Sequence, residues 1–502
     1  MTIWRRALAS PLAPLVLLAA FAVLIVVTID RFSIWIDESA TLDLVGPNGY
    51  AEIVRRASHD VHPPLWYLVL KPWLQLFGTG VVAARSQAAV FMLAAFGVWY
   101  HFFRTRWSRR VALLALALMV TNPMLLHYAV EGRMYAWGCL LTALGCVLLT
   151  GTWRWRWLAY WVCAVVMLYT HYFLAFVVAG QFAYLLLRRG AHGRSARWLV
   201  VYGASMILAF GPWLPFALHG TSDIVAHGFW IPAISASTFP GYVLTTFLHR
   251  LDGDLKGWFA FLAVTYLVTW IAVLVRVARE RDGELALLWA LIAVPAALLL
   301  LLSCRPLVPV FHPRYLVFSL PALIALLSLG ALACTPRRRG FAIAVLLAGN
   351  LAGLRMLEWR GFNDTHGYWS MKTVAAELAQ PIDGEVPTVV ATALFVYSDA
   401  HILLGDHQPI VYFRDALPKP EIFPDILYYD HRDWWILSFD EIHARHVWLL
   451  ENVHAAPFPV PATWHLEDTR SLGYARYRLF TLPRDGAHEP PKVEPPAPNP
   501  AG

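Results

Sequence analysis

Two adjacent carboxylates, Asp37 and Glu38, stand just beyond an uncharged run that ends at Ile29 in a chain of 502 residues. Such a pair can deprotonate a hydroxyl group or hold a cation. Aspartate is also a favoured residue at the start of a helix, so Asp37 can instead cap an interfacial helix that begins near Ser39. The sequence therefore predicts either a reactive pair or a helix cap at this point.

A second polar stretch places Asp60 and His62 directly before Pro63 and Pro64, and proline suits the first turn of a helix. An Asp and His pair can move a proton or hydrogen-bond a polar substrate. The alternative is a plain loop-to-helix junction with interfacial aromatic residues. Lys71 lies on the aromatic stretch that follows, where it either binds substrate or extends its ammonium group to the membrane interface.

Arginine appears at the outer ends of two further apolar segments. Arg133 comes shortly before Tyr135, and Arg314 lies between His312 and Tyr315. A guanidinium group is a planar fork that binds phosphate through two hydrogen bonds. Both arginines fall on the side of the membrane where the positive-inside rule disfavours basic residues, so we expect them to bind substrate.

Two further residues leave alternatives open. His171 lies at the tip of a predicted helical hairpin, where it contacts substrate or packs as a buried side chain. Glu131 offers Arg133 an ion pair, which would make that arginine structural.

Membrane helices must position these residues, because 58% of the chain is hydrophobic and only 15% is charged. In a soluble domain, closer to a quarter of the residues are charged. Long uncharged runs predict a polytopic bundle of about eleven transmembrane helices, if residues 157–187 form a tight hairpin. With that hairpin, the arginine clusters all lie on one side, as the positive-inside rule requires. The clusters are Arg5/6, Arg104/106/109/110, Arg154/156, Arg188/189/194/197, Arg276/279/281 and Arg337/338/339.

This topology places the N-terminus in the cytoplasm and a C-terminal domain outside it. The arginines do not form one patch, so nucleic acid is not an expected partner. The five cysteines lie in or beside apolar segments, and no metal-ligand spacing stands out, so no metal site is predicted.

Composition changes after the last apolar run. Residues 1–358 are predicted to form the transmembrane module and residues 359–484 a small α/β domain, with a helix at 369–380 and strands at 386–393, 409–413, 446–450 and 474–482. The proline-rich residues 485–502 are expected to form a disordered tail.

These stretches, in this order, resemble the polyprenyl-phosphate-dependent membrane glycosyltransferases of the GT-C fold. The likeness is closest to bacterial relatives of the protein O-mannosyltransferases, the aminoarabinose transferases and the rhizobial lipopolysaccharide-core transferases. It is carried by Trp35-Ile36-Asp37-Glu38, His62-Pro63-Pro64-Leu65-Trp66-Tyr67, Glu131-Gly132-Arg133-Met134-Tyr135-Ala136, Tyr169-Thr170-His171-Tyr172-Phe173 and Pro313-Arg314-Tyr315-Leu316.

The resemblance implies an inverting glycosyltransferase whose donor is a sugar on a polyprenyl phosphate and whose acceptor is a hydroxyl on a glycan, lipid or protein. Asp37 would be the catalytic base, and Glu38 and the region of Asp60 and His62 would shape the acceptor and donor pocket. Arg133 and Arg314 would bind the lipid phosphate. No cofactor is expected beyond the lipid-linked donor, and the expected location is the bacterial inner membrane among its lipids.

Two other classes of protein remain as alternatives. A transporter or flippase for a lipid-linked sugar would carry functional charges near the middle of the bilayer and show repeat symmetry. A non-catalytic membrane scaffold would tolerate replacement of Asp37.

Overall fold

The computed structural model is mainly helical, with one small sheet. It describes residues 10–34, 36–190, 192–219, isolated residues between 231 and 247, 257–280, 283–304, 309–363, 371–405, 408–413, 435–436 and 438–483. The chain divides into two compact units. The first comprises Met1–Phe32, Ala40–Asn363 and Glu421–Leu427, and the second comprises Ser33–Ser39, Asp364–Pro420 and Tyr428–Gly502. The predicted boundary at 358/359 stays a prediction, and the predicted tail lies outside the described residues.

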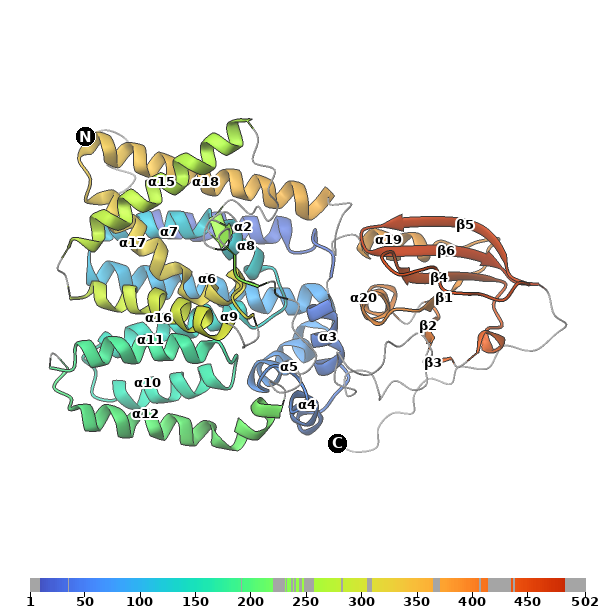
Figure 1. The fold of residues 1–502 in the computed structure, drawn as a ribbon, viewed down its shortest axis with the longest axis horizontal. Helices are drawn as coiled ribbons and strands as arrows, with labels where there is room; N and C mark the ends of the chain where they lie inside the picture. The colour runs from blue at the N-terminus through green and yellow to red at the C-terminus, as the bar shows by residue number, and fades with distance from the viewer. Residues whose placement is uncertain are drawn as a thin grey trace. The chain divides into compact units, whose positions relative to one another are not determined.

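The first unit is built from helices (Figure 1). They are α2 (Ala13–Thr28), α3 (Ile36–Val45, divided between the units), α4 (Tyr50–Ala57), α5 (Leu65–Phe77), α6 (Val81–Arg106), α7 (Arg109–Val120), α8 (Pro123–Ala129), α9 (Tyr135–Thr150), α10 (Arg156–Leu168), α11 (Leu174–Leu187), α12 (Ala196–Phe210), η1 (Gly211–Trp213), α15 (Gly257–Ala278), α16 (Leu285–Ser303), η2 (Pro313–Ser319), α17 (Leu320–Leu332) and α18 (Pro336–Asn363).

Fewer of these helices are long enough to cross a membrane than the sequence predicted. Five described helices have the required length and apolar composition, or six if α7 and α8, bent by 67°, form one broken span. The predicted number of about eleven is therefore not met. Uncharged runs in the sequence include turn residues, so the helices themselves are shorter than the runs. Four apolar helices (α2, α9, α10 and α11) have only 10–17 residues, below the roughly 20 that a bilayer core requires.

The break between α7 and α8 has a local cause. The Asn122 side chain accepts a hydrogen bond from the Leu125 backbone N–H at 3.0 Å, and Pro123 opens the new helix. Proline has no N–H to continue the preceding helix, so α7 ends and α8 begins in a new direction. The buried Asn350 amide of α18 donates to the Leu118 carbonyl at 2.9 Å, which satisfies a carbonyl near the end of α7.

Small residues let neighbouring helices approach closely. A Cβ atom placed on Gly180 of α11 would lie 2.7 Å from the Ala290 carbonyl oxygen of α16. A Cβ atom on Gly330 of α17 would clash with the Val273 carbonyl of α15. Membrane helices commonly associate through such small residues, because backbones can then come into van der Waals contact.

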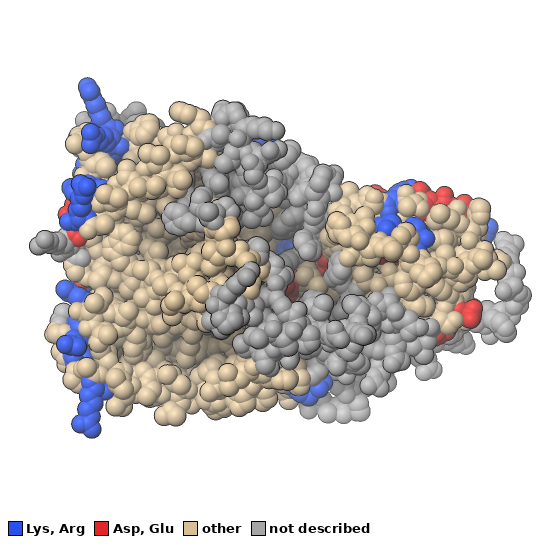
Figure 2. Space-filling model, in the orientation of Figure 1, with Lys and Arg blue, Asp and Glu red and all other residues tan. Residues whose placement is uncertain are grey.

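Basic residues collect at one end of the helical unit. Figure 2 shows Lys and Arg side chains along the left-hand end of the bundle. Figure 1, in the same orientation, places α4 and α5 at the opposite end. Arg104 and Arg106 belong to the basic residues at the end of α6. Among the described residues, the two ends of the bundle therefore differ in their content of basic side chains.

The second unit holds a six-stranded sheet in the order β3-β2-β1-β4-β6-β5. Strands β1, β2, β3 and β4 pair in parallel, and β6 pairs antiparallel with both β4 and β5. The elements are α19 (Met371–Leu378), β1 (Thr388–Ala391), α20 (Leu394–Leu404), β2 (Ile410–Phe413), β3 (Trp435–Ile436), η8 (Phe439–Glu441), β4 (His446–Asn452), β5 (His465–Leu472) and β6 (Ala475–Thr481).

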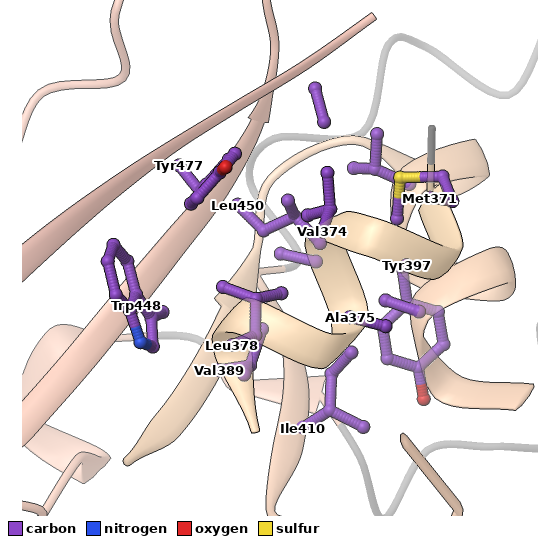
Figure 3. Close-up of a cluster of buried hydrophobic side chains, with 14 of the residues drawn as sticks. Met371, Val374, Ala375, Leu378, Val389, Tyr397, Ile410, Trp448, Leu450 and Tyr477 are labelled. Atoms are coloured by element: carbon purple, nitrogen blue, oxygen red, sulfur yellow. The ribbon is translucent and has the colours of Figure 1, made fainter. Parts of the chain in front are cut away.

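A hydrophobic core joins α19 and α20 to one face of this sheet. Figure 3 shows Val374 and Leu378 of α19 beside Val389, Leu450 and Tyr477 of the strands. The four strands and the helix predicted in this region are confirmed within a few residues. Helix α20 and strands β3 and β5 were not predicted.

Candidate functional site

The turn before α5 gathers the first polar group of the site. Asp60 accepts hydrogen bonds from the Tyr67 hydroxyl and from the Val61 backbone N–H at 2.7 Å, and its carboxylate lies 3.6 Å from His62 Nδ1. The Leu65 N–H donates to the Tyr169 carbonyl at 3.1 Å, which ties the start of α5 to the α10–α11 connection. The turn that carries His62 is therefore fixed by hydrogen bonds at Asp60 and at the start of α5.

The environment of Asp60 favours its ionised form. Burial acts to raise the pKa of the carboxyl group, but hydrogen bonds and charge from His62, Tyr67 and Arg133 lower it further than burial raises it. The net pKa lies below the ordinary value, so Asp60 is a carboxylate at neutral pH. It balances part of the positive charge of the arginines described below.

Arg133 lies in the short connection between α8 and α9 and is 4% exposed. Its Nη1 donates to the Thr41 hydroxyl of α3, and its Nη2 lies 3.4 Å from His62 Nδ1. Glu131, the ion-pair partner that the sequence offered, lies 3.2 Å from His127 Nε2. The guanidinium group is thus a buried cation directed at α3 and at the turn before α5.

An aromatic wall continues from Arg133 toward η2. The ring of Tyr135 lies 5.8 Å from that of His171, and the Arg314 Cζ lies 6.0 Å from the Tyr135 ring centroid. The rings of His171 and Tyr315 are 5.9 Å apart. Because aromatic faces attract cations, this wall can hold Arg314 without a full shell of water.

His312 organises the start of η2. Its Nδ1 accepts a hydrogen bond from the Arg314 backbone N–H at 3.3 Å, which makes it the cap of the helix. Burial, with a contribution from Arg314, lowers the pKa of His312 to about 3. The imidazole is therefore neutral at physiological pH and keeps the lone pair that the cap requires.

The structure thus brings eight of the predicted site residues into one connected group in the first unit. Its members are Asp60, His62, Arg133, Tyr135, His171, His312, Arg314 and Tyr315. They come from the connections between helices and from helix ends. Within the described residues, no three His, Cys, Asp or Glu side chains are grouped as metal ligands would be.

Lys71 is placed differently. Its ammonium group donates to the backbone carbonyls of Val45 and Gly46, at 3.1 and 2.9 Å, where α3 ends. A cation at the C-terminus of a helix satisfies unpaired carbonyls and complements the helix dipole. A role in substrate binding stays a prediction, whereas the contact itself positions α3.

Asp37 and Glu38 occupy the first turn of α3, which begins at Ile36. Asp37 therefore lies inside the helix, and the interpretation of Asp37 as the cap of a helix beginning near Ser39 is wrong. Asp37 is partly exposed, whereas Glu38 is 3% exposed. Residues four apart lie on one helix face, so Asp37 shares a face of α3 with Thr41.

Three residues of this region were not predicted as site residues. They are Thr41, which accepts from Arg133; Tyr67, which donates to Asp60; and Arg85, whose Nη1 donates to the Ile29 and Phe32 carbonyls at 2.9 and 2.8 Å. The spacing of Thr41 from Asp37 by one helical turn was the one available signal. The contacts of Arg85 join distant parts of the chain, which a single sequence does not reveal.

Comparison with known proteins identifies the fold. No protein-family model matches the chain, and no curated protein matches its sequence. Among solved structures, ArnT from Cupriavidus metallidurans bound to undecaprenyl phosphate is similar over 94% of this chain and 98% of its own, with a TM-score of 0.60 and 15% identity. The same protein in the apo state is similar over 93% of this chain and 97% of its own, with a TM-score of 0.59 and 15% identity.

The chain has the GT-C fold. The match extends over nearly the whole of both chains, so it includes the helical unit and the C-terminal region. An oligosaccharyltransferase from Archaeoglobus fulgidus is more distant, with a TM-score of 0.45, 10% identity, and coverage of 88% of this chain and 68% of its own. The predicted polytopic GT-C architecture is therefore confirmed as a fold, with the smaller number of membrane-length helices given above.

Proposed function

We propose that this chain is an inverting glycosyltransferase that moves a sugar from a polyprenyl-phosphate donor to an acceptor hydroxyl on a cell-envelope glycan, lipid or protein. The observation that carries this proposal is the group formed by buried Arg133, half-buried Arg314 and the neutral imidazoles of His171 and His312 at one end of a GT-C bundle. Guanidinium groups in a low-dielectric site bind phosphate strongly. The likeness to ArnT, solved with undecaprenyl phosphate, supports a polyprenyl carrier.

The proposed reaction needs one base and one site for the leaving group. Asp37 accepts the proton of the acceptor hydroxyl, and the hydroxyl oxygen forms a bond to the anomeric carbon of the sugar. The bond from that carbon to the phosphate oxygen breaks, and its electron pair stays on the phosphate. Attack opposite the leaving group inverts the anomeric configuration. The products are the glycosylated acceptor and a polyprenyl phosphate.

Each remaining residue supports one of these steps. Arg133 and Arg314 stabilise the charge that grows on the phosphate as the bond breaks, so they contribute most in the transition state. Asp60 and His62 orient Arg133. Glu38 shapes the pocket beside Asp37. The leaving group belongs to the donor itself, so the reaction proposed here calls for no separate cofactor.

The distribution of basic residues supports an orientation in the membrane. Arginines collect at the end of the bundle opposite α4 and α5 (Figures 1 and 2). By the positive-inside rule that end faces the cytoplasm. The site then lies at the extracytoplasmic face of a bacterial inner membrane. From the arginine clusters of the sequence, we also propose a cytoplasmic N-terminus and an extracytoplasmic C-terminal unit.

A lipid-linked sugar transporter is the alternative function. A transporter binds its cargo near the middle of the bilayer, often at broken helices. Arg133, His171 and Arg314 lie instead in helix connections and at the start of η2. This placement favours an interfacial enzyme.

Release of polyprenyl phosphate tests the proposal without knowledge of the sugar. Purified protein would be mixed with a membrane lipid extract and an acceptor extract, and the released lipid measured by mass spectrometry. Asp37→Asn should lower the rate at least about 100-fold, because loss of a general base typically costs that much. Asp43→Asn, the same change on the same helix, should leave the rate unchanged. Full activity in Asp37→Asn would refute the base assignment.

A second variant tests the phosphate site. Arg314→Ala should weaken donor binding at least about tenfold, because a charge-assisted hydrogen bond is lost. Arg104→Ala, in the last turn of α6 at the basic end of the bundle, is the control. Sugar that crosses a bilayer with no release of polyprenyl phosphate would favour the transporter instead.

A further inference from the structure

His171 is buried at the centre of the group that contains both arginines. It lies in the connection between α10 and α11 and is 2% exposed. Its ring lies 5.2 Å from the ring of His62, at an interplanar angle of 65°, and 5.6 Å from Phe318. Polar side chains are rarely buried this completely unless each polar atom has a partner.

One nitrogen of this ring is satisfied and fixes the position of the proton. His171 Nδ1 accepts a hydrogen bond from the Phe173 backbone N–H at 3.1 Å. An accepting Nδ1 carries a lone pair, so the neutral ring carries its proton on Nε2. His171 is thereby a hydrogen-bond donor at Nε2.

The other nitrogen is buried, and no hydrogen-bond partner for it occurs within the part of the chain that the structure describes. A buried donor left unsatisfied is a substantial cost to a folded protein. The residues that surround His171 are mainly aromatic: Tyr135, Phe173, Tyr315 and Phe318. The geometry therefore leaves Nε2–H available to an acceptor atom that comes from a ligand.

Charge around His171 indicates the chemistry of that acceptor. Burial, together with His62, Arg133 and Arg314, holds the pKa of His171 well below its ordinary value. The ring is neutral, yet it lies in a positive field created by its neighbours. An anionic oxygen suits such a place better than a neutral hydroxyl, since it gains from the field and from the hydrogen bond.

We propose that His171 Nε2–H donates a hydrogen bond to a non-bridging oxygen of the phosphate group that Arg133 and Arg314 bind. It acts as a neutral positioning donor and not as an acid or base. This inference rests on the proposed function and adds to it one recognition residue with a defined tautomer. A third, uncharged donor orients the phosphate without adding a cation that the two guanidinium groups would repel.

Two substitutions at one position separate the hydrogen bond from the packing. His171→Phe keeps an aromatic ring and removes the donor, whereas His171→Gln places an amide N–H near the Nε2 position. With undecaprenyl phosphate in detergent at pH about 8, His171→Phe should bind at least about tenfold more weakly than the wild type. His171→Gln should bind undecaprenyl phosphate with an affinity within about threefold of the wild type. His101→Phe, an exposed histidine of α6, is the control.

Two other probes identify the bound group. Undecaprenol has no phosphate and should show no difference between the wild type and His171→Phe. Inorganic phosphate should bind weakly and lose affinity in His171→Phe if the phosphate alone is recognised. A loss seen with undecaprenol instead would overturn the proposal, because the residue would then act on the lipid chain.

A pH series tests the neutral state of the ring. With a polyprenyl phosphodiester, whose charge does not change in this range, the ratio of wild-type to His171→Gln affinity should be equal within about threefold at pH about 8 and 5.5. A ratio that rises steeply at low pH would show that His171 binds as a cation and would overturn the proposal. Unchanged binding in His171→Phe, or equal losses in both variants, would overturn it as well.

Failure of this inference differs from failure of the proposed function. If the function is wrong, the wild type releases no polyprenyl phosphate and Arg314→Ala has no effect on donor binding. If only the inference is wrong, the wild type and Arg314→Ala behave as proposed while His171→Phe binds normally. Thermal unfolding of each variant in detergent identifies any loss that comes from misfolding.

Discussion

At the scale of single residues, two histidines of the group have pKa values lowered by burial and by nearby guanidinium groups, and both use Nδ1 as an acceptor from the backbone. His171 and His312 therefore act as neutral groups with fixed tautomers. Position near the outer ends of apolar segments was enough to predict both as site residues. Neither their burial nor their tautomers could be predicted, because both depend on contacts with helices that are distant in sequence.

A pH dependence of stability follows for His312. Its pKa is about 3 in the folded protein and near 6.5 when unfolded, so the unfolded state binds more protons between these values. Stability is complete above pH about 6.5 and falls as the pH drops. His312→Asn keeps a capping acceptor but does not titrate. Between pH about 7 and 5, its free energy of unfolding should therefore fall by about 1–2 kcal/mol less than that of the wild type.

Thermal unfolding in detergent at both pH values measures this difference. His101→Asn, at an exposed position, should follow the wild type. An identical loss in His312→Asn and in the wild type would show that His312 does not carry the effect.

At the scale of elements, the sequence predicted those with a simple pattern and missed those without one. Strands β1, β4 and β6 were predicted because buried or alternating residues mark them. Strand β5 is exposed along most of its length at the edge of the sheet, so no alternation marks it. Lys71 could be placed on a helix from the sequence, but its contact with the end of α3 could not be predicted.

Close approach of α11 and α16 predicts a large effect at one glycine. Gly180→Ala would force the two backbones apart, because the added Cβ atom would lie 2.7 Å from the Ala290 carbonyl oxygen. We expect a loss of about 1–3 kcal/mol of stability. Gly97→Ala in α6 meets nothing within 4 Å and should be neutral or stabilising by up to about 1 kcal/mol.

Unfolding of the two variants in detergent compares these positions directly. We expect Gly180→Ala to unfold at a temperature well below that of the wild type, and Gly97→Ala to unfold at or above the wild-type temperature. Equal stability in all three proteins would mean that α11 and α16 do not pack as described.

At the scale of the whole molecule, the predicted GT-C fold agrees with the structure, but the predicted number of membrane-spanning helices does not. The order of the polar stretches was sufficient to predict the GT-C fold. The number of membrane-length helices is five or six and not eleven, because short and bent helices make up much of the bundle. Sequence hydropathy counts apolar runs, and it does not detect where a helix bends or ends inside a run.

A structure of the protein with bound undecaprenyl phosphate would show whether Arg133, Arg314 and His171 hold the phosphate group. We predict phosphate oxygens about 3 Å from the guanidinium groups of Arg133 and Arg314, and one such oxygen within hydrogen-bonding distance of His171 Nε2. A phosphate bound elsewhere on the molecule, with these three side chains left in contact only with protein, would contradict this prediction.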